Sequence, residues 1–282
     1  MMKFTKMHGL GNDYLYVYSQ TEPGDEEARD LSIRLSDRHF GAGSDGMIWI
    51  LPSRVADFKM RIFNADGSEA KMCGNGIRCV GKYVYDKGYT QKTELKVETL
   101  SGVKTLTLFV EDGRVSRASV EMGKAVFYDI MALDVKTLEA GKKDLEALDC
   151  EGDSIHCFPV SMGNPHAVIF TKDAENAPLT TMGAAIEHHP AFPGGVNVEF
   201  VQVVDRKTLR MRVWERGSGV TMACGTGACA SAAAAVRAGY CSPDTDIQVI
   251  LDGGSLTVRV AKDHRVLMTG PAATVYEGET ED

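Results

Sequence analysis

Residues 61–76 read RIFNADGSEAKMCGNG, and residues 212–227 read RVWERGSGVTMACGTG. The two stretches align without a gap at an offset of 151 residues, which places Cys73 opposite Cys224. In each stretch a strand-like run leads into a glycine-containing turn, and Cys-Gly-x-Gly then opens a helical segment. An internal repeat of this kind indicates two copies of one supersecondary unit. We therefore expect two homologous halves that each carry one cysteine at the start of a helix.

The repeat extends beyond the two cysteines. Gly11–Asp13 matches Gly163–Pro165 at an offset of 152 residues, and Phe40–Asp45 matches Phe192–Asn197 at the same offset. Agreement between separate stretches at nearly one offset is hard to explain by chance. The pattern predicts a boundary between the halves near residues 115–150.

The bulk composition is that of a globular protein. The 282 residues are 44% hydrophobic and 25% charged, which is ordinary for such proteins. A formal net charge of −8 argues against phosphate-backbone binding as the main task. The start, Met1–Phe4, has no apolar signal core, and no apolar run is long enough to span a bilayer. We expect a cytoplasmic protein that binds neither nucleic acid nor membrane.

The chain contains seven cysteines. An odd count without a signal peptide indicates reduced thiols rather than a disulfide framework. The spacings are unlike those of common zinc sites, so we expect no metal. The cysteines outside the repeated motif are interpreted as small buried hydrophobes or bystanders: Cys79, Cys150, Cys157, Cys229 and Cys241.

The sequence predicts many strands and few helices. Helices are expected at Glu26–Asp37, Gly74–Tyr85, Leu179–His188 and Gly225–Arg237. Gly88 and Gly239 lie where helix C-caps belong. Strands that alternate with single long helices favour an α+β fold in which a sheet wraps around a helix in each half. The charged stretch 134–153 is interpreted as a linker or surface excursion.

The repeated Cys-Gly-x-Gly motif suits the binding of an anion beside a reactive sulfur. Glycines let backbone N–H groups approach a ligand closely. The unpaired amides of the first helical turn bind anions, and the same position favours the thiolate form of a cysteine by lowering its pKa. In a single copy, the alternative is a turn whose cysteine only packs. Two copies at one offset favour function.

Two such thiols could act on one substrate from opposite sides. A thiolate would remove a proton from a carbon, and a thiol would return a proton to the other face, which inverts a stereocentre without a cofactor. Amides around the substrate carboxylate would stabilise the charge that develops. A covalent cysteine nucleophile is the competing use, and His8, His39 or His166 could serve it. A lone nucleophile, however, does not explain the duplication.

Several motifs resemble those of diaminopimelate epimerase over nearly the whole chain. They are KMHGLGND at 6–13, MCGNGIRC at 72–79, GNPH at 163–166, WERG at 214–217 and ACGTGA at 223–228. The resemblance implies two pseudo-symmetric domains, each a curled, mainly antiparallel sheet around a central helix, with the active site between them. It implies domains at 1–118 and 119–264, with the C-terminal segment 265–282 completing the first. It further implies a homodimer and no cofactor.

The resemblance also assigns roles residue by residue. Cys73 and Cys224 would be the acid/base pair. The substrate-binding residues would be Asn12, Asn64, Gly74, Asn75, Asn164, Asn197, Glu215, Arg216, Gly225 and Thr226. His166 and Glu215 would adjust the protonation of the thiols. One departure is Gly46, which stands where some members carry glutamine.

Three hypotheses follow from different classes of protein. The first is epimerisation of LL-diaminopimelate to the meso form, for lysine and peptidoglycan precursor synthesis. The second is a proline or hydroxyproline type of racemase or epimerase with the same fold. The third is a non-enzymatic thiol redox or metal protein. Arg216, Asn64 and Asn197 favour the first, because a second amino-acid group on the substrate needs polar anchors.

Overall fold

The computed structural model describes residues 1–134, 138, 148, 150–151 and 154–280. The chain forms two compact units, Met1–Glu121 with Thr269–Asp282 and Met122–Met268. The chain passes from the first unit to the second within a long strand, β8, and returns within another, β19. No helix in the described part of the chain is both long and apolar enough to cross a membrane.

The first unit is built on one run of paired strands. The strands are β1 (Lys3–Gly9), β2 (Asn12–Tyr18), β3 (Gly46–Leu51), β4 (Phe58–Asn64), β5 (Glu69–Ala70), β6 (Glu94–Thr99), β7 (Gly102–Glu111), β8 (Arg114–Lys124) and β20 (Ala273–Glu279). From β1 to β7 the successive pairs β1–β2, β2–β3, β3–β4, β4–β6 and β6–β7 alternate antiparallel and parallel. The C-terminal strand β20 pairs antiparallel with β1, with Thr5 opposite Glu277. The end of the chain therefore adds a strand to the unit in which the chain began.

The second unit repeats this pattern. Its strands are β9 (Val126–Phe127), β10 (Met131–Asp134), β11 (Cys150–Glu151), β12 (Ser154–Ser161), β13 (Pro165–Phe170), β14 (Asn197–Asp205), β15 (Thr208–Glu215), β16 (Gly219–Val220), β17 (Asp246–Leu251), β18 (Gly254–Val260) and β19 (Arg265–Pro271). From β12 to β18 the pairs β12–β13, β13–β14, β14–β15, β15–β17 and β17–β18 again alternate antiparallel and parallel. The same order of pairings in both units confirms the two-domain α+β prediction.

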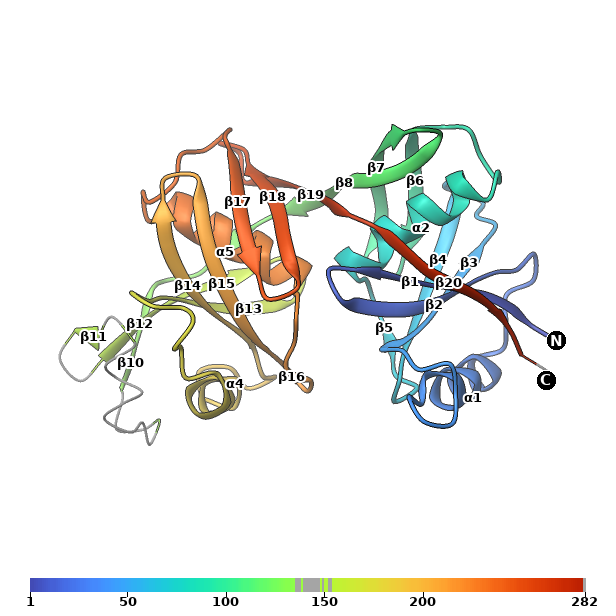
Figure 1. Ribbon diagram of the computed structural model, residues 1–282. Helices are drawn as coiled ribbons and strands as arrows, with labels where there is room; N and C mark the ends of the chain where they lie inside the picture. Colours follow the sequence, from blue (N-terminus) through green and yellow to red (C-terminus); the bar gives the residue numbers. More distant parts are fainter. Residues whose placement is uncertain (135–137, 139–147, 149, 152–153, 281–282) are drawn as a thin grey trace. The chain divides into compact units, whose positions relative to one another are not determined.

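One central helix fills each unit. Figure 1 shows α2 (Gly74–Asp86) and α5 (Gly225–Arg237), each enclosed by strands of its own unit. Helix α2 packs against β1, β2 and β7, and α5 packs against β12–β15, β17 and β18. Both helices are buried along most of their length, which is why α5 consists largely of alanine. Small side chains let a sheet close tightly around a helix on every side.

Each central helix connects two parallel strands and ends at a glycine. A parallel pair requires a crossover connection, and α2 and α5 supply it between β4 and β6 and between β15 and β17. Gly88 and Gly239 follow the two C-caps at φ 76° and 80°. Glycine adopts this left-handed conformation without strain. The two glycines thus lie one residue after the C-caps Lys87 and Ala238 and end the helices as the sequence predicted.

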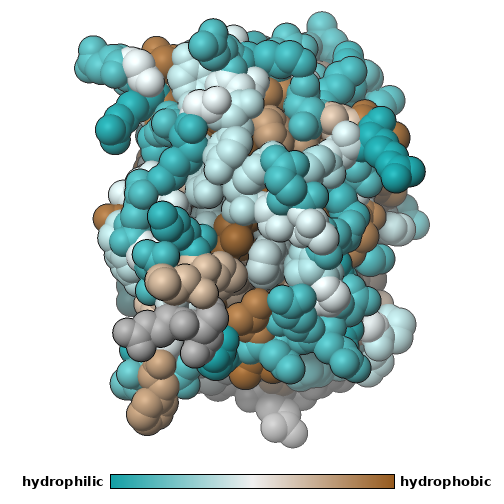
Figure 2. Space-filling model, turned by 90° about the vertical axis from the view of Figure 1, so that its right-hand side faces the viewer, coloured by the Kyte–Doolittle hydropathy of each residue, from teal (hydrophilic) through white to brown (hydrophobic). Residues whose placement is uncertain are grey.

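Shorter helices cover another part of each sheet. In the first unit α1 (Asp25–Ser36) packs on β3 and β4 over a core that includes Leu15, Met47 and Phe63. In the second unit a π-helical turn, η2 (Leu179–Gly183), runs into the short helix α4 (Ala184–Glu187), where the sequence predicted one helix. Charged and polar side chains predominate on the face that Figure 2 shows, with apolar residues scattered among them.

The prediction for residues 134–153 needs a partial correction. Most of this stretch lies outside the described residues. Leu138 and Leu148, however, are 5% and 4% exposed and belong to the apolar core of the second unit. The stretch is therefore not purely a surface excursion, because its two described leucines are removed from water. The short strand β11 also pairs with β12.

Candidate active site

Cys73 occupies the N-cap of α2 in the first unit. Its backbone is extended, and its Sγ accepts a hydrogen bond from the N–H of Gly76 at 3.3 Å. This is the bond that a capping serine or threonine makes to a free amide of the first helical turn. The half-buried thiol also donates to Oδ1 of Asn12 at 3.3 Å. The fold thus holds the sulfur at a helix N-terminus, as predicted.

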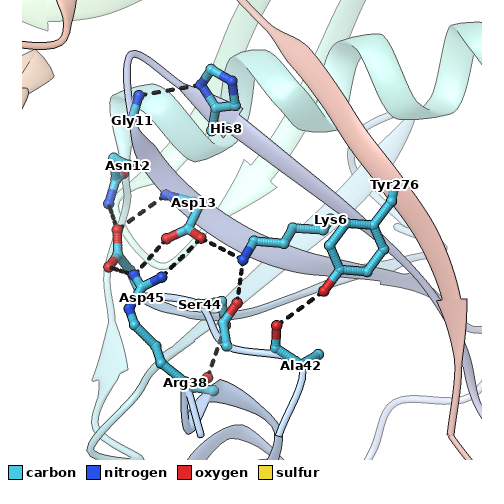
Figure 3. Close-up of polar contacts among 12 residues, drawn as sticks. Lys6, His8, Gly11, Asn12, Asp13, Arg38, Ala42, Ser44, Asp45 and Tyr276 are labelled. Carbon is cyan, nitrogen blue, oxygen red and sulfur yellow. Dashed lines mark hydrogen bonds and ion pairs between the residues drawn. The ribbon is translucent and has the colours of Figure 1, made fainter.

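A network of hydrogen bonds and ion pairs among charged residues holds the side chain of Asn12 (Figure 3). Nδ2 of Asn12 donates to Oδ2 of Asp45 at 2.8 Å, and the same oxygen accepts the backbone N–H of Asp13 at 3.0 Å. Arg38 bonds both carboxylates, and Lys6 pairs with Asp13 at 2.9 Å. Burial opposes ionisation of Asp13, but the bonds from Arg38 and Lys6 outweigh it and lower its pKa. Asn12 is therefore held by a fixed set of charges.

The remaining predicted residues of the first unit lie around the start of α2 or at the end of β4. Asn64 ends β4, and its Nδ2 donates to Oγ of Ser68 across the turn. Asn75 is 2% exposed, and its Oδ1 accepts from the buried Arg78 at 2.9 Å. The bond from Arg78 fixes the direction in which the Asn75 side chain lies. Gly74 offers only backbone.

Cys224 occupies the matching N-cap of α5 in the second unit. Its Sγ accepts the N–H of Gly227 at 3.3 Å, the same distance as in the first unit. Cys224 is only 5% exposed, however. Burial raises the pKa of the Cys224 thiol well above its usual range, and the nearby charges of Glu215 and Glu199 add to the effect. The expectation that the helix N-terminus lowers the pKa of this cysteine is therefore wrong, because burial and two carboxylates outweigh the amides.

Glu215 lies beside the Cys224 thiol at the end of β15. Burial raises the pKa of this carboxyl, partly offset by hydrogen bonds from Thr221 and Cys224. A carboxylate that accepts a hydrogen bond from the S–H stabilises the protonated sulfur. The role of Glu215 in adjusting the protonation of the thiol stays a prediction.

His166 is buried and joins Asn164 to a second acid. Its Nδ1 lies 2.7 Å from Oε1 of Glu199, and its Nε2 lies 3.1 Å from Oδ1 of Asn164. Nδ2 of Asn164 in turn donates to Oγ1 of Thr226 at 3.3 Å, and Thr226 lies 3.5 Å from the Cys224 sulfur. Four predicted residues of the second unit are thus brought together: His166, Asn164, Thr226 and Cys224. Gly225 is the first residue of α5 beside them.

Arg216 lies on an exposed turn that other residues fix in place. Its backbone N–H donates to Oδ1 of Asn197 at 2.9 Å, and its Nη1 donates to the carbonyl oxygen of Gly194 at 3.0 Å. The buried Glu187 accepts from the N–H of Gly217 at 2.9 Å and from the indole N–H of Trp214 at 2.6 Å. The guanidinium is therefore presented by a constrained backbone.

Several residues of these networks were not predicted from the sequence, and two of them, Glu199 and Asp45, bond directly to predicted site residues. Glu199 is fully buried, and its Oε2 has no hydrogen-bond partner among the described residues. An acid between the apolar residues Val198 and Phe200 of β14 was the signal for it. Asp45 was missed, although its match to Asn197 at an offset of 152 residues was a signal that could have found it.

The departure at Gly46 has a steric cause. A Cβ at this position would lie 2.2 Å from the carbonyl oxygen of Phe63 and 2.9 Å from Cα of Asn64. Backbone atoms cannot yield to such a contact, so this backbone accommodates only glycine. No side chain reaches the site from position 46.

Comparisons with known proteins agree on one family. The family model described as diaminopimelate epimerase matches residues 4–128 and 158–275. A diaminopimelate epimerase of Acetivibrio thermocellus is 48% identical over 283 residues, covering 99% of each chain. One from Bacillus licheniformis is 50% identical over 280 residues, covering 98% of this chain and 97% of the relative.

Solved structures share the fold at low sequence identity. A phenazine biosynthesis protein of the PhzF family from Bacillus anthracis is 17% identical, with a TM-score of 0.81 over 100% of this chain and 99% of that one. A hydroxyproline epimerase from Agrobacterium vitis is 16% identical, with a TM-score of 0.72 over 99% of this chain and 90% of that one. Proteins with other names therefore share this fold. By its sequence, this chain belongs to the diaminopimelate epimerase family.

Proposed function

We propose that this protein interconverts LL- and meso-diaminopimelate by two-base proton transfer at the α carbon, with Cys73 and Cys224 as the acid/base pair and no cofactor. The observation that carries the proposal is the twin placement of these thiols. Each is the N-cap of the central helix of its unit, and each accepts a first-turn amide at 3.3 Å. Membership of the family supplies the substrate.

The reaction conserves protons within the pair. One sulfur enters as a thiolate and removes the α-proton, and the other enters as a thiol and delivers its proton to the opposite face of the carbon. The sulfurs have then exchanged roles, so the reverse reaction starts from the other thiolate. The buried Cys224 beside Glu215 suits the thiol state. Backbone amides at the starts of α2 and α5, with the side chain of Thr226, would stabilise the charge that develops on the substrate carboxylate.

The other predicted residues would hold the substrate. Asn12, Asn64, Asn164 and Asn197 supply amide groups, and Arg216 supplies a planar cation that can bind a carboxylate through two parallel hydrogen bonds. His166 and Glu215 would adjust the protonation of Cys224. We further propose that the enzyme acts in the cytoplasm as a homodimer, in the synthesis of lysine and peptidoglycan precursors.

The deciding experiment follows reduced protein with LL-diaminopimelate in D₂O by NMR and chiral chromatography. We expect the meso form to appear, with one deuterium at the inverted α carbon, because the second thiol has exchanged its proton with solvent. L-Proline and trans-4-hydroxy-L-proline serve as parallel substrates. Inversion of these imino acids, with diaminopimelate left unchanged, would replace the proposal with the racemase alternative.

A further inference from the structure

The charged network behind Asn12 has a directional effect on the Cys73 sulfur. A side-chain amide has an acceptor oxygen and a donor nitrogen, and only the surrounding hydrogen bonds decide which way it faces. Here Oδ2 of Asp45 accepts from Asn12 and from the backbone N–H of Asp13, and Oδ1 accepts from Arg38. Burial and the charge of Asp13 raise the pKa of Asp45. The bonds from the Asp13 N–H, Asn12 and Arg38 act against this shift. The backbone amide and the guanidinium are obligatory donors, and the ionised carboxylate that they stabilise can only be an acceptor. The group of Asn12 that faces it must be the NH₂.

We propose that Asp45 is a positioning residue that fixes the Asn12 amide with Oδ1 toward Cys73, so that Asn12 holds the proton of this thiol. The inference rests on the proposed function for its catalytic meaning. An oxygen at 3.3 Å from Sγ can accept from S–H but offers nothing to a thiolate. Asp45 therefore disfavours the thiolate at Cys73 through Asn12, without touching the sulfur.

The backbone around Asp45 is anchored well enough for such a role. Its N–H donates to the carbonyl oxygen of Asp13 at 2.8 Å, and its own carbonyl accepts from Ala65 at 2.9 Å. Figure 3 shows the carboxylate between Asn12, Asp13 and Arg38. The neighbouring segment is tied to β20 through the Tyr276 hydroxyl, which donates to the carbonyl oxygen of Ala42 at 3.0 Å. The acceptor that orients Asn12 is thus fixed from both sides.

Other titratable groups also act on Cys73 or Asp45. The test must therefore separate the effect of the Asp45 charge from the effect of the Asn12 orientation. Tyr16 of β2 and Cys79 of α2 interact electrostatically with Cys73. Asp13, Arg38 and Lys6 surround the carboxylate of Asp45. Asp45→Asn removes the negative charge but keeps an oxygen for Asn12 and Asp13. Asp45→Ala removes both charge and acceptor.

The test measures alkylation of Cys73 by iodoacetamide against pH, with mass spectrometry of the modified peptides and no substrate. In Asp45→Ala the Asn12 amide is free to rotate, so we expect the Cys73 profile to move to lower pH and its rate at neutral pH to rise about fivefold. Asp45→Asn should stay within about twofold of the wild type, because the orienting oxygen remains. The double variant Asn12→Ala with Asp45→Ala should react like Asn12→Ala alone. The Cys224 rate is an internal control.

Three outcomes would overturn the proposal. If the pH profile of Cys73 alkylation were unchanged in Asp45→Ala, Asp45 would have no effect on this thiol. If the profile shifted equally in Asp45→Asn and Asp45→Ala, the effect would come from the charge of Asp45 alone. Additive effects in the double variant would show that Asp45 does not act through Asn12. Asp37→Ala is the matched control, since Asp37 caps the same connection through His39 and Phe40 without contacting Asn12.

Misfolding is separable from a positioning effect. Cys79 is fully buried, so alkylation of Cys79 would report unfolding. If Asp45→Ala shows such unfolding, Asp45→Ser replaces it, because the serine hydroxyl is too short to reach Asn12. The alkylation assay needs no turnover, so it stands or falls separately from the proposed function. If wild-type protein is an epimerase, Asp45→Ala should also move the alkaline limb of its activity profile to lower pH.

Discussion

Cys73 and Cys224 have the same backbone environment in the two units but different side-chain surroundings. Both are N-caps with an extended backbone. Each sulfur accepts a hydrogen bond at 3.3 Å from the backbone N–H three residues further along the chain. Cys73 is half-buried against the neutral Asn12, whereas Cys224 is 5% exposed beside Glu215 and Glu199. The two sulfurs therefore have the same position at the start of a helix, and the side chains around them differ.

Three matched pairs, each at an offset of 151 residues, differ in charge between the two units. They are Ile48 and Glu199, Asn64 and Glu215, and Ala65 and Arg216. Glycines in the first helical turns show that the first pair is also equivalent in space. A Cβ at Gly76 would lie 2.6 Å from Cδ1 of Ile48, and a Cβ at Gly227 would lie 2.7 Å from Oε1 of Glu199. The acids and the guanidinium of the second unit thus replace apolar or neutral side chains of the first.

The largest expected effect comes from removing either thiol. Cys73→Ala and Cys224→Ala should each reduce epimerisation by about a thousandfold or more, because each sulfur serves one face of the carbon. Either variant should still eliminate a leaving group from a halogenated analogue in the direction that its remaining base serves. Cys241→Ala, at a buried cysteine outside the motif, should remain active. Substantial epimerisation by either motif variant would refute the two-base mechanism.

The next effect concerns the guanidinium that only the second unit carries. Arg216→Lys should raise KM for diaminopimelate about a hundredfold, because an ammonium cannot form the two parallel bonds of a guanidinium with a carboxylate. L-Lysine, which lacks the second carboxylate, should be a very poor substrate even for the wild type. Steady-state kinetics measure both, with Arg265→Lys at an exposed arginine as the control. Equal rates with lysine and diaminopimelate would contradict recognition of the second carboxylate.

A smaller effect should follow from neutralising the buried acid. The charge of Glu199 helps to raise the pKa of Cys224, so Glu199→Gln should lower that pKa. Cys224 would then ionise and be alkylated at lower pH, while Cys73 in the other unit keeps its profile. We expect turnover to fall about tenfold. Asp205→Asn, at an exposed acid on the same strand, is the control. If the Cys224 profile did not move, burial alone would explain its protonation.

Much of the fold was predictable because the repeat is local in sequence. Helix α5 was predicted with its observed bounds, and the predicted α2 ended one residue before the observed helix. Both predictions used the strand-like run before each helix, the Cys-Gly-x-Gly motif at its start and the glycine after its end. Residues on the repeated turns, such as Asn12 and Asn164, were found by their matching positions. The segment 179–188 was harder, because a π-helical turn and a short α-helix share one apolar pattern.

The sequence by itself determined the two-fold organisation, the central helices and the placement of a thiol at the start of each, since hydrophobic periodicity and glycine positions specify local backbone. Only the tertiary structure decided how each thiol is protonated. The pKa of Cys224 depends on burial and on Glu199, which lies 25 positions away in the chain. The orientation of Asn12 depends on Asp45, on a different connection. Electrostatic energies depend on distance and desolvation in space, and neither can be read from spacing along the chain.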